Sequence, residues 1–344
     1  MSVYSIDLSS KDKWKKCLNK FENLDFHFYP DYHDLYHSTY KKSDSLLWVY
    51  ENEEKIFLYP FHKTKINLEI LKTEIFYDIS STYGFVGPVS NTTDEVFILD
   101  AWQKFDEWAV KKNIILEFIR FNPLKGNHNL SHKNTIVEFN RQVAVSDFTK
   151  GEIYFKNKIP SKTKNMIKKA LKNGFKTSRL NFLDYKNQFA KIYLETMERN
   201  KATNFFYYDE EYFNKLANLK ETEFYGIIQN DILIAGGIFF VSNSIASYHL
   251  GVCLTDYLKF GLSNLYLYDA SIDFIKKKVL YMNLGGGRST DVNDGLLKFK
   301  RDNSTDLKEF FIGKRIINKK IYEIISEEFK IDQRQNNKLI FYRN

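Results

Sequence analysis

Residues 279–303, VLYMNLGGGRSTDVNDGLLKFKRDN, decide the fold expected for the second half of this chain. The mostly apolar run VLYMNL predicts a short buried strand, and the glycines after it predict a turn. A polar loop follows, and the chain returns through a lysine-rich segment, KFKR. Glycines let backbone N–H groups approach a ligand, and the cations favour an anionic one. The stretch therefore predicts an anion-binding site, while a plain turn followed by a solvated edge strand stays open as the simpler interpretation.

Length and composition bound the class of protein. The 344 residues are enough for about two domains, each able to bury its own core. A content of 43% hydrophobic and 27% charged residues is typical of a globular protein. The aromatic share of 17% is high, and we expect most of these rings to fill cores and strands.

The cysteines and the apolar runs help to predict the cellular compartment of the protein. Cys17 and Cys253 are far apart in the sequence, which supports neither a disulfide framework nor a metal site. The first residues lack the apolar core of a signal peptide, and the longest apolar run, 232–241, is broken by two glycines and too short to cross a bilayer. These features predict a cytoplasmic protein.

The net charge of the chain indicates which kinds of binding partner are compatible with it. The formal net charge is +8, with a pI near 9.0. An excess of this size is compatible with a nucleic acid, a nucleotide-linked substrate or an anionic membrane face.

The first half predicts alternating strands and helices. Residues 46–66 have the pattern of a β-hairpin, 92–112 have helical spacing, and the segment after them is a buried strand. We expect a first domain over residues 1–148. His27, His33 and His37 raise the question of a metal, but no carboxylate or cysteine cluster accompanies them, and we predict none.

The second half, residues 149–344, predicts a mixed-sheet domain. A lysine-rich helix ends at Gly174, and it is either a solvated face or an anion-binding surface. A second helix covers 189–201, and three strand candidates follow, at 224–229, 232–241 and 244–250. A helix over 261–278 then leads into the strand of the opening stretch.

Four segments of the second half carry a family resemblance: RNKATNFFYYDEEYF, AGGIFF, SYHLGVCLTDYLKFGLSNLYLYDA and MNLGGGRSTDVNDGLLKFKRDN. Together they resemble the FemAB-type branch of the GNAT-like acyltransferases. STYGFVGPV in the first half is similar to the glycine-proline segment of that family. The resemblance covers most of the chain and is strongest over 161–303. It implies an α/β fold of two GNAT-like domains with mixed β-sheets flanked by helices.

The resemblance also implies a function. Members include aminoacyl-tRNA-dependent enzymes that build peptidoglycan cross-bridges, and acyltransferases of surface-polysaccharide clusters. We therefore expect transfer of an acyl or aminoacyl group to an amine on a peptidoglycan peptide or an amino sugar. The donor, aminoacyl-tRNA or acyl-CoA, is a co-substrate, so no cofactor is expected. Only Gly261 of residues 258–263 matches the pyrophosphate motif of acetyl-CoA-dependent enzymes, which weakens the alternative of an acetyl-CoA-dependent N-acetyltransferase of a nucleotide-linked amino sugar.

The same resemblance suggests catalytic residues. The Phe-Lys pair of the family falls on Phe299 and Lys300, and the lysine would steady the negative charge that develops on the carbonyl oxygen. His249 is a candidate general base, because its side chain titrates in the right range, although a packed strand histidine is the commoner case.

Other residues are candidates for substrate binding. By the same resemblance, Arg199 is the candidate for contact with acceptor phosphates, which suit an arginine fork. Further candidates are Arg288 and Gly286 of the opening stretch, and Tyr83 and Tyr208, which either contact substrate or fill cores. Asp291 and Asp294 lie in the same loop as Arg288 and are equally good turn formers.

The expected partners follow from this function. The first is an envelope precursor, UDP-linked or lipid-linked; tRNA and a peripheral membrane contact stay open. No RNP, KH or helix-turn-helix pattern is present, and stable DNA binding is not expected. Two further classes stay open: a non-catalytic nucleic-acid-binding protein and an inactive acyltransferase fold that acts as a scaffold.

Overall fold

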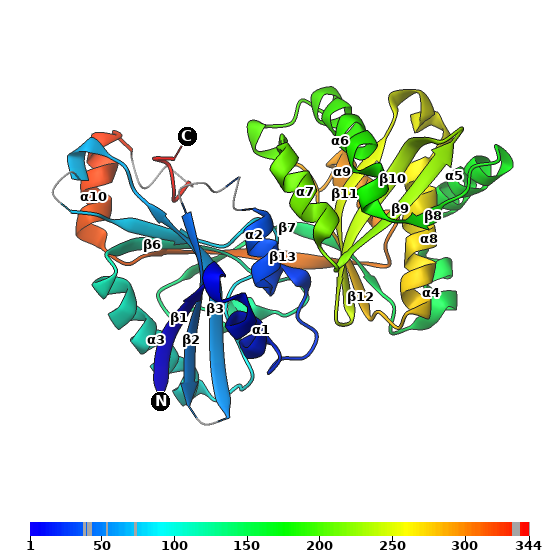
Figure 1. Ribbon diagram of the computed structural model, residues 1–344. Coiled ribbons are helices and arrows are strands. Elements are labelled where there is room, and N and C mark those ends of the chain that lie inside the picture. Colours follow the sequence, from blue (N-terminus) through cyan, green and yellow to red (C-terminus); the bar gives the residue numbers. More distant parts are fainter. Residues whose placement is uncertain (37–38, 40–42, 53, 72–73, 332–337, 344) are drawn as a thin grey trace. The chain divides into compact units, whose positions relative to one another are not determined.

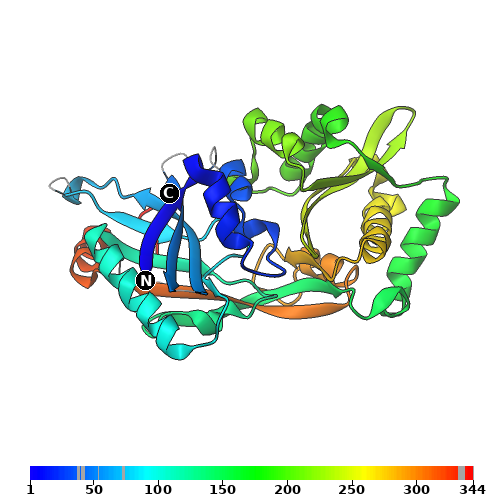
Figure 2. The same ribbon diagram turned by 60° about the horizontal axis from the view of Figure 1, so that its bottom comes forward.

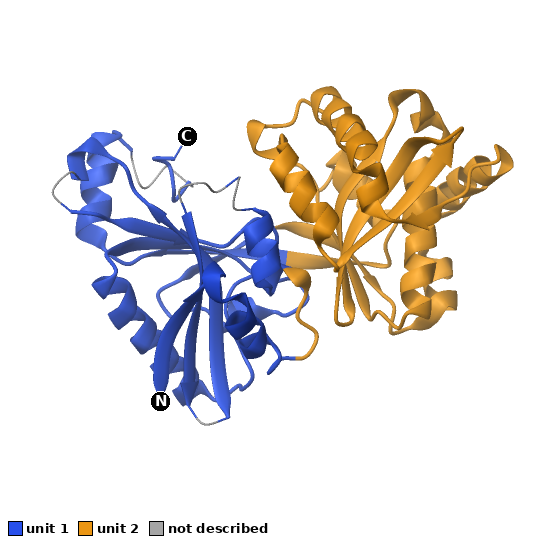
Figure 3. Cartoon of the chain, in the orientation of Figure 1, with its two compact units in different colours: residues 1–21, 27–140, 310–344 blue, residues 22–26, 141–309 orange. Residues whose placement is uncertain are grey.

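The computed structural model describes residues 1–36, 39, 43–52, 54–71, 74–331 and 338–343. The chain forms two compact units (Figure 3). Unit 1 comprises Met1–Phe21, His27–Asn140 and Phe310–Asn344, and unit 2 comprises Glu22–Phe26 and Arg141–Glu309. Each unit has a β-sheet flanked by helices, so the predicted α/β class with mixed sheets is confirmed.

At the C-terminus the two units differ from the predicted domain ranges, 1–148 and 149–344. Residues 310–344 belong with unit 1, because β13 (Asp306–Ile316) pairs antiparallel with β6 (Ile114–Arg120). This pairing joins segments far apart in the sequence, which local patterns do not reveal. The division into domains 1–148 and 149–344 stays a prediction.

Unit 1 is built on a sheet whose predicted hairpin is confirmed. β2 and β3 pair antiparallel, with Trp48 opposite Tyr59. The strands lie in the order β1 (Ser2–Asp7), β2 (Ser43–Asn52), β3 (Lys55–Lys65), β4 (Tyr77–Ser80), β6 and β13, and β5 (Val89–Ser90) pairs with β3 (Figure 1).

Aromatic side chains form the core of unit 1. α3 (Glu95–Lys111) confirms the predicted helix, and the Asp94 side chain caps it by accepting from the N–H groups of Val96 and Phe97. Trp102 and Phe105 of α3 pack on the rings of β2 and β3. The remaining helices of this unit are α1 (Lys11–Leu18), α2 (Pro30–Leu35) and α10 (Lys319–Glu328).

Unit 2 contains the three strands predicted between residues 224 and 250. Its strands lie in the order β7 (Ile136–Asp147, part of this unit from Arg141), β12 (Tyr281–Gly286), β11 (Ile245–Cys253), β10 (Ile232–Ser242), β9 (Thr222–Gln229) and β8 (Ser178–Leu180). β11 and β12 are parallel, and the other pairs in this series are antiparallel.

Helices cover both faces of this sheet, with α6 and α7 on one face and α8 on the other (Figure 2). Two glycines of β10 permit the close packing. A Cβ on Gly236 would lie 2.6 Å from the Phe224 ring, and one on Gly237 would lie 2.5 Å from the Tyr266 ring of α8. The helices are α4 (Gly151–Lys158), α5 (Ser161–Lys172), α6 (Phe182–Arg199), α7 (Glu210–Asn218), α8 (Leu262–Lys276) and α9 (Gly295–Arg301).

Within the described part of the chain, none of the helices has both the length and the apolar character that a bilayer crossing requires.

Candidate active site

The opening stretch of the sequence forms a strand, a loop and a short helix in unit 2. β12 extends through Gly286, and the chain then turns toward α9. The simpler alternative of an edge strand through KFKR is therefore wrong, because these residues are helical. The reason is Asp294, whose Oδ1 accepts from the backbone N–H groups of Leu296 at 2.9 Å and Leu297 at 3.0 Å and so caps the helix.

The turn of α9 brings Lys300 back onto the glycines of β12. Its Nζ donates to the Gly286 carbonyl at 3.0 Å. Gly285 has φ +77°, which disfavours a side chain, and a Cβ there would lie 3.3 Å from the same Nζ. An ammonium has three N–H donors, so the contact with Gly286 leaves two for a ligand.

The surroundings of Lys300 tune its charge. Burial lowers the pKa of the Lys300 ammonium to about 8, while the nearby Asp294 carboxylate acts in the opposite direction. Near neutral pH the side chain is therefore still mostly a cation. A cation held in place before reaction is suited to stabilising negative charge that develops on a substrate.

Asp294 organises the loop between β12 and α9. Its Oδ2 accepts from the N–H groups of Arg288 and Ser289, both at 3.1 Å, in addition to the two bonds at the helix. Partial burial alone would raise the pKa of this carboxyl, but the hydrogen bonds outweigh burial and hold the pKa at about 2. Gly287 makes room for it, because a Cβ there would lie 2.4 Å from Oδ1.

Loss of this acceptor should loosen the loop. We expect Asp294→Ala to lower the free energy of unfolding by about 1–2 kcal/mol, as for other lost N-caps, measured by urea denaturation. Because the pKa is lowered on folding, this stabilisation is present above the unfolded value of 3.8 and is lost as the pH falls through about 2. Asp291→Ala is the matched control, since Asp291 accepts from the Asn293 N–H in the same loop. An equal cost for both variants would contradict the special role of Asp294.

Arg288 and Arg199 both have hydrogen-bond contacts at the end of α6. Arg288 donates to Oδ1 of Asn200, the residue that follows the helix, at 3.0 Å. Arg199 donates to the carbonyl of Cys253, the last residue of β11, at 3.4 Å and to the hydroxyl of Thr255, two residues further on, at 2.7 Å. The structure thus brings both arginines to one region of unit 2 and joins them to the Lys300 loop through Arg288.

His249 lies at the same end of the sheet as Gly285. The parallel pairing of β11 and β12 ends at Ser247 and Asn283, and His249 and Gly285 each follow two residues later. The His249 ring lies 4.4 Å from that of Phe240, centroid to centroid, and its Nε2 is hydrogen-bonded to the Tyr212 hydroxyl. The ring is held in place on two sides.

Tyr212 is a residue that the sequence analysis missed. It lies on α7 and stacks on Tyr208, with 3.9 Å between ring centroids, so Tyr208 and His249 belong to one aromatic cluster. The signal was present in FFYYDEEYF: Tyr208 and Tyr212 are four apart, and Asp209 caps α7 by accepting from the Tyr212 N–H.

Tyr83 belongs to unit 1. Its carbonyl accepts from the Tyr32 hydroxyl at 2.9 Å, and its ring lies 5.7 Å from the Arg120 guanidinium. Arg120 also donates to the Gly84 carbonyl at 2.9 Å. These contacts fix the glycine-proline segment within unit 1.

The described residues hold no group of three or more His, Cys, Asp or Glu side chains arranged for a metal. His33 is fully buried between the rings of Trp14 and His62, and burial lowers its pKa to about 3. His37 lies outside the described residues.

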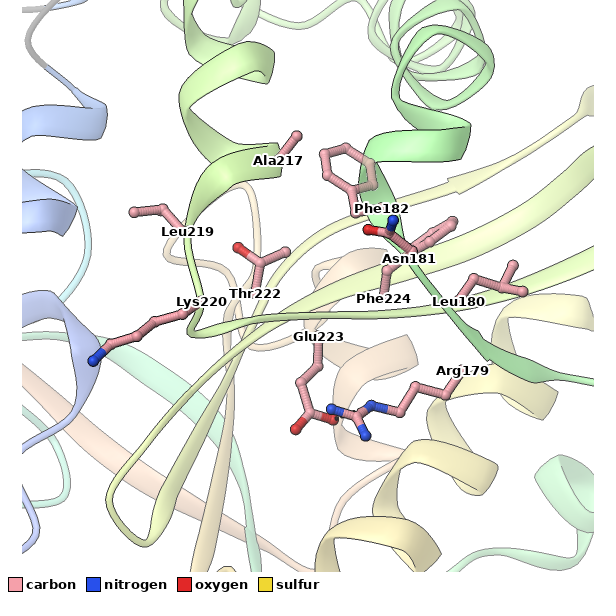
Figure 4. Close-up of a pocket in the computed structure, with 10 residues that line it drawn as sticks. All are labelled: Arg179, Leu180, Asn181, Phe182, Ala217, Leu219, Lys220, Thr222, Glu223 and Phe224. Carbon is pink, nitrogen blue, oxygen red and sulfur yellow. Dashed lines mark ion pairs between the residues drawn. The ribbon is translucent and has the colours of Figure 1, made fainter.

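Unit 2 also has a cavity of about 410 Å³ at the other edge of its sheet (Figure 4). It lies where β8 and β9 meet the start of α6 and the end of α7, and Arg179 and Glu223 form an ion pair at 3.3 Å on its wall. None of the predicted site residues lines it. The cavity is therefore separate from the Lys300 loop.

Comparisons with known proteins define the fold. No protein-family model matches the sequence, and no curated protein matches it. Among solved structures, FemX matches with a TM-score of 0.68 at 14% identity, covering 94% of this chain and 100% of FemX. L-PGS from Bacillus licheniformis matches with a TM-score of 0.57 at 13% identity, covering 88% of this chain and 91% of its own.

A third structure agrees with these two. The C-terminal domain of a putative lysylphosphatidylglycerol synthetase from Agrobacterium fabrum matches with a TM-score of 0.57 at 10% identity, covering 92% of this chain and 96% of its own. The chain therefore has a FemX-like fold, and the resemblance seen in its residues is confirmed at the level of the fold.

Proposed function

We propose that this chain is an acyltransferase that moves an acyl or aminoacyl group to an amine of a cell-envelope precursor. The observation that carries the proposal is the Lys300 ammonium, held against the Gly286 carbonyl at the end of β12. When an amine attacks an ester or thioester, negative charge develops on the carbonyl oxygen. Lys300 would donate to that oxygen, and because its position is set before reaction, little reorganisation is needed.

The reaction also has to move a proton. The new bond joins the amine nitrogen to the carbonyl carbon, and the bond from that carbon to the donor oxygen or sulfur breaks. His249 is the proposed base that takes a proton from the attacking amine, and the leaving oxygen or sulfur takes up a proton as it departs. The Tyr212 hydroxyl would hold the imidazole in place for this step.

The remaining candidates are assigned to the substrate. Arg199 and Arg288 are proposed to bind the phosphates of a UDP-linked or lipid-linked acceptor, and Tyr208 to contact the acceptor as well. An aminoacyl donor is supported by the name of one structural neighbour, a putative lysylphosphatidylglycerol synthetase, which refers to an aminoacylated lipid. Gly261 has a packing role that needs no CoA, since a Cβ there would lie 2.8 Å from Met166 of α5.

Ligand-induced thermal stabilisation tests this proposal, because a ligand that binds only the folded state raises the melting temperature. The panel is acetyl-CoA, bulk aminoacylated tRNA and UDP-linked envelope precursors. A shift with tRNA or a precursor and none with acetyl-CoA would support the proposal. A shift with acetyl-CoA would support an N-acetyltransferase of an amino sugar instead, and no shift with any of them would favour the scaffold interpretation.

The pKa of Lys300 sets an expected pH dependence. If Lys300 acts as a cation, we expect kcat/KM to fall as the pH rises through about 8, because the ammonium loses its proton there. Lys300→Arg should lower the rate but remove this limb, since a guanidinium stays charged throughout. A rate that keeps rising through this range in the unmodified protein would show that Lys300 acts as a base or not at all.

A further inference from the structure

The net charge of the chain is concentrated in one segment. Residues 151–180, here called the basic segment, hold eight lysines, one arginine and one glutamate, a formal charge of +8. The whole chain has 51 Lys and Arg against 43 Asp and Glu, which is also +8. Outside the basic segment, therefore, the chain has 42 residues of each sign and is neutral. An excess this localised indicates a specific surface and not a general property of the protein.

The basic segment forms α4, α5 and β8 in unit 2 (Figure 1). α5 packs against α8 through one face, where Thr163, Ile167 and Ala170 are buried. Its other faces carry the charge. Five lysines of the segment on or just after α5 are exposed: Lys162, Lys168, Lys169, Lys172 and Lys176.

Two exposed leucines lie among these lysines. Leu171, 53% exposed, follows Lys168 by one turn of α5 and precedes Lys172. Leu258, 45% exposed, lies on the 3-10 helix Thr255–Phe260. That helix packs on α5, where the Lys169 Nζ donates to the Lys259 carbonyl at 2.8 Å.

We propose that this surface, the basic face formed by α5 and the 3-10 helix Thr255–Phe260, docks on the surface of an anionic lipid bilayer. Lysines near such a surface are attracted to lipid phosphates, and their contributions add. Exposed apolar side chains next to them enter the boundary between headgroups and acyl chains. An RNA backbone would satisfy the lysines but offers nothing to Leu171 and Leu258. Arginine, whose fork suits nucleic-acid phosphates, occurs once in the basic segment against eight lysines.

This docking does not depend on the transfer reaction proposed above. It would place unit 2 at a membrane, where a lipid-linked acceptor is found. Vesicle binding therefore tests it separately from turnover: Lys300→Met should bind vesicles as the unmodified protein does, whatever its activity.

Sedimentation of the full chain with lipid vesicles measures the docking. We expect binding to phosphatidylcholine vesicles that contain about one third phosphatidylglycerol, weakened by added salt, and little binding to phosphatidylcholine alone. The triple variant Lys168→Gln, Lys172→Gln, Lys176→Gln should bind these vesicles on the order of a hundredfold less tightly. Each lysine near the membrane contributes about 1 kcal/mol, and about 1.4 kcal/mol corresponds to a tenfold change in affinity.

A matched control distinguishes the effect of where the lysines lie from the effect of net charge on vesicle binding. The variant Lys111→Gln, Lys112→Gln, Lys133→Gln removes three exposed lysines of unit 1 and gives the same net charge. It should bind vesicles almost normally. Equal losses in the two triple variants would overturn the proposal, because binding would then follow net charge alone.

A second variant separates lipid from RNA. Leu171→Ser with Leu258→Ser keeps every charge, and we expect it to weaken vesicle binding while leaving the binding of bulk tRNA unchanged. No binding to the anionic vesicles at physiological salt, with tRNA binding that the α5 triple variant abolishes, would overturn the membrane proposal and identify the basic face as an RNA surface.

Discussion

Lys300→Met should lower kcat by about 10²- to 10³-fold with the true substrates, the usual cost of removing one donor to a developing oxyanion. The loss should appear in kcat more than in KM, because the carbonyl oxygen gains its charge only in the transition state. Steady-state kinetics with the donor and acceptor found by thermal stabilisation would measure it. Turnover that survives the change would show that the candidate active site is wrongly assigned.

The stability of Lys300→Met tests whether a loss of activity could come from unfolding. The pKa of Lys300 is lowered on folding, so the folded protein holds this proton less tightly than the unfolded chain. The stability of the unmodified protein should therefore rise with pH between about 8 and the unfolded value of 10.5. Methionine has similar length and carries no charge to desolvate, so Lys300→Met should melt no lower than the unmodified protein at neutral pH.

Lys298→Met is the matched control on α9. Lys298 is exposed and lies two residues from Lys300, so its side chain points to another side of the short helix. We expect kcat within about twofold of normal, because exposed charges away from a site have small effects. A comparable loss in both variants would indicate that the charge of α9, and not the position of Lys300, matters.

Arg315→Met should destabilise unit 1 by about 3–5 kcal/mol, the typical cost of breaking a buried ion pair from one side. Arg315 on β13 is 4% exposed, and its Nε lies 2.7 Å from Oε1 of Glu117, the fully buried residue opposite it on β6. Its guanidinium also lies over the rings of Trp102 and Phe105. Without Arg315 the Glu117 carboxylate would stay buried and lose the cation that contacts it.

Denaturant unfolding of Arg315→Met, monitored through hydrogen exchange of the β6 amides, would measure this loss of stability. Burial already raises the pKa of Glu117, and removal of Arg315 would raise it further. Because that pKa lies above the unfolded value of 4.5, the variant should lose stability as the pH rises above 4.5. The destabilisation should therefore be larger at pH 8 than at pH 5.

Two further variants test the cause. Arg315→Met with Glu117→Leu removes both charges and should recover much of the stability, since apolar replacements of buried pairs are often tolerated. Lys314→Met removes the neighbouring ion pair, Lys314 to Glu138 at 2.6 Å, whose glutamate is 43% exposed. That change should cost about 1 kcal/mol or less. A double variant as unstable as Arg315→Met alone would show that packing, and not the unpaired charge, is responsible.

Local patterns predicted most of the elements. The helix expected over 92–112 is α3, and the strands expected between 224 and 250 are β9, β10 and β11. Each has eight or more residues, in which apolar residues recur at helical spacing or form apolar runs. The helix expected over 189–201 is α6, which begins earlier, at Phe182, after the Asn181 cap. Where the pattern was short, prediction failed: α9 has seven residues, too few to separate a helix from a strand.

Residues of the candidate site were harder to predict than elements. The glycine run and Lys300 stand out in the sequence. The spacing of Tyr208 and Tyr212 is also visible there, but the contact of Tyr212 with His249, 37 residues away in the chain, is not. The grouping of residues 310–344 with unit 1 likewise rests on the pairing of β13 with β6.

Composition, periodicity and capping residues are properties of neighbouring residues, so the sequence by itself determined the fold class, most helices and strands, and the concentration of charge in the basic segment. The tertiary structure alone decided that Lys300 lies against Gly286, that Asp294 holds the loop, and that Arg315 and Glu117 are buried as a pair. A lowered lysine pKa or a buried ion pair depends on which distant segments exclude water from the charge, and that exclusion exists only once the chain has folded.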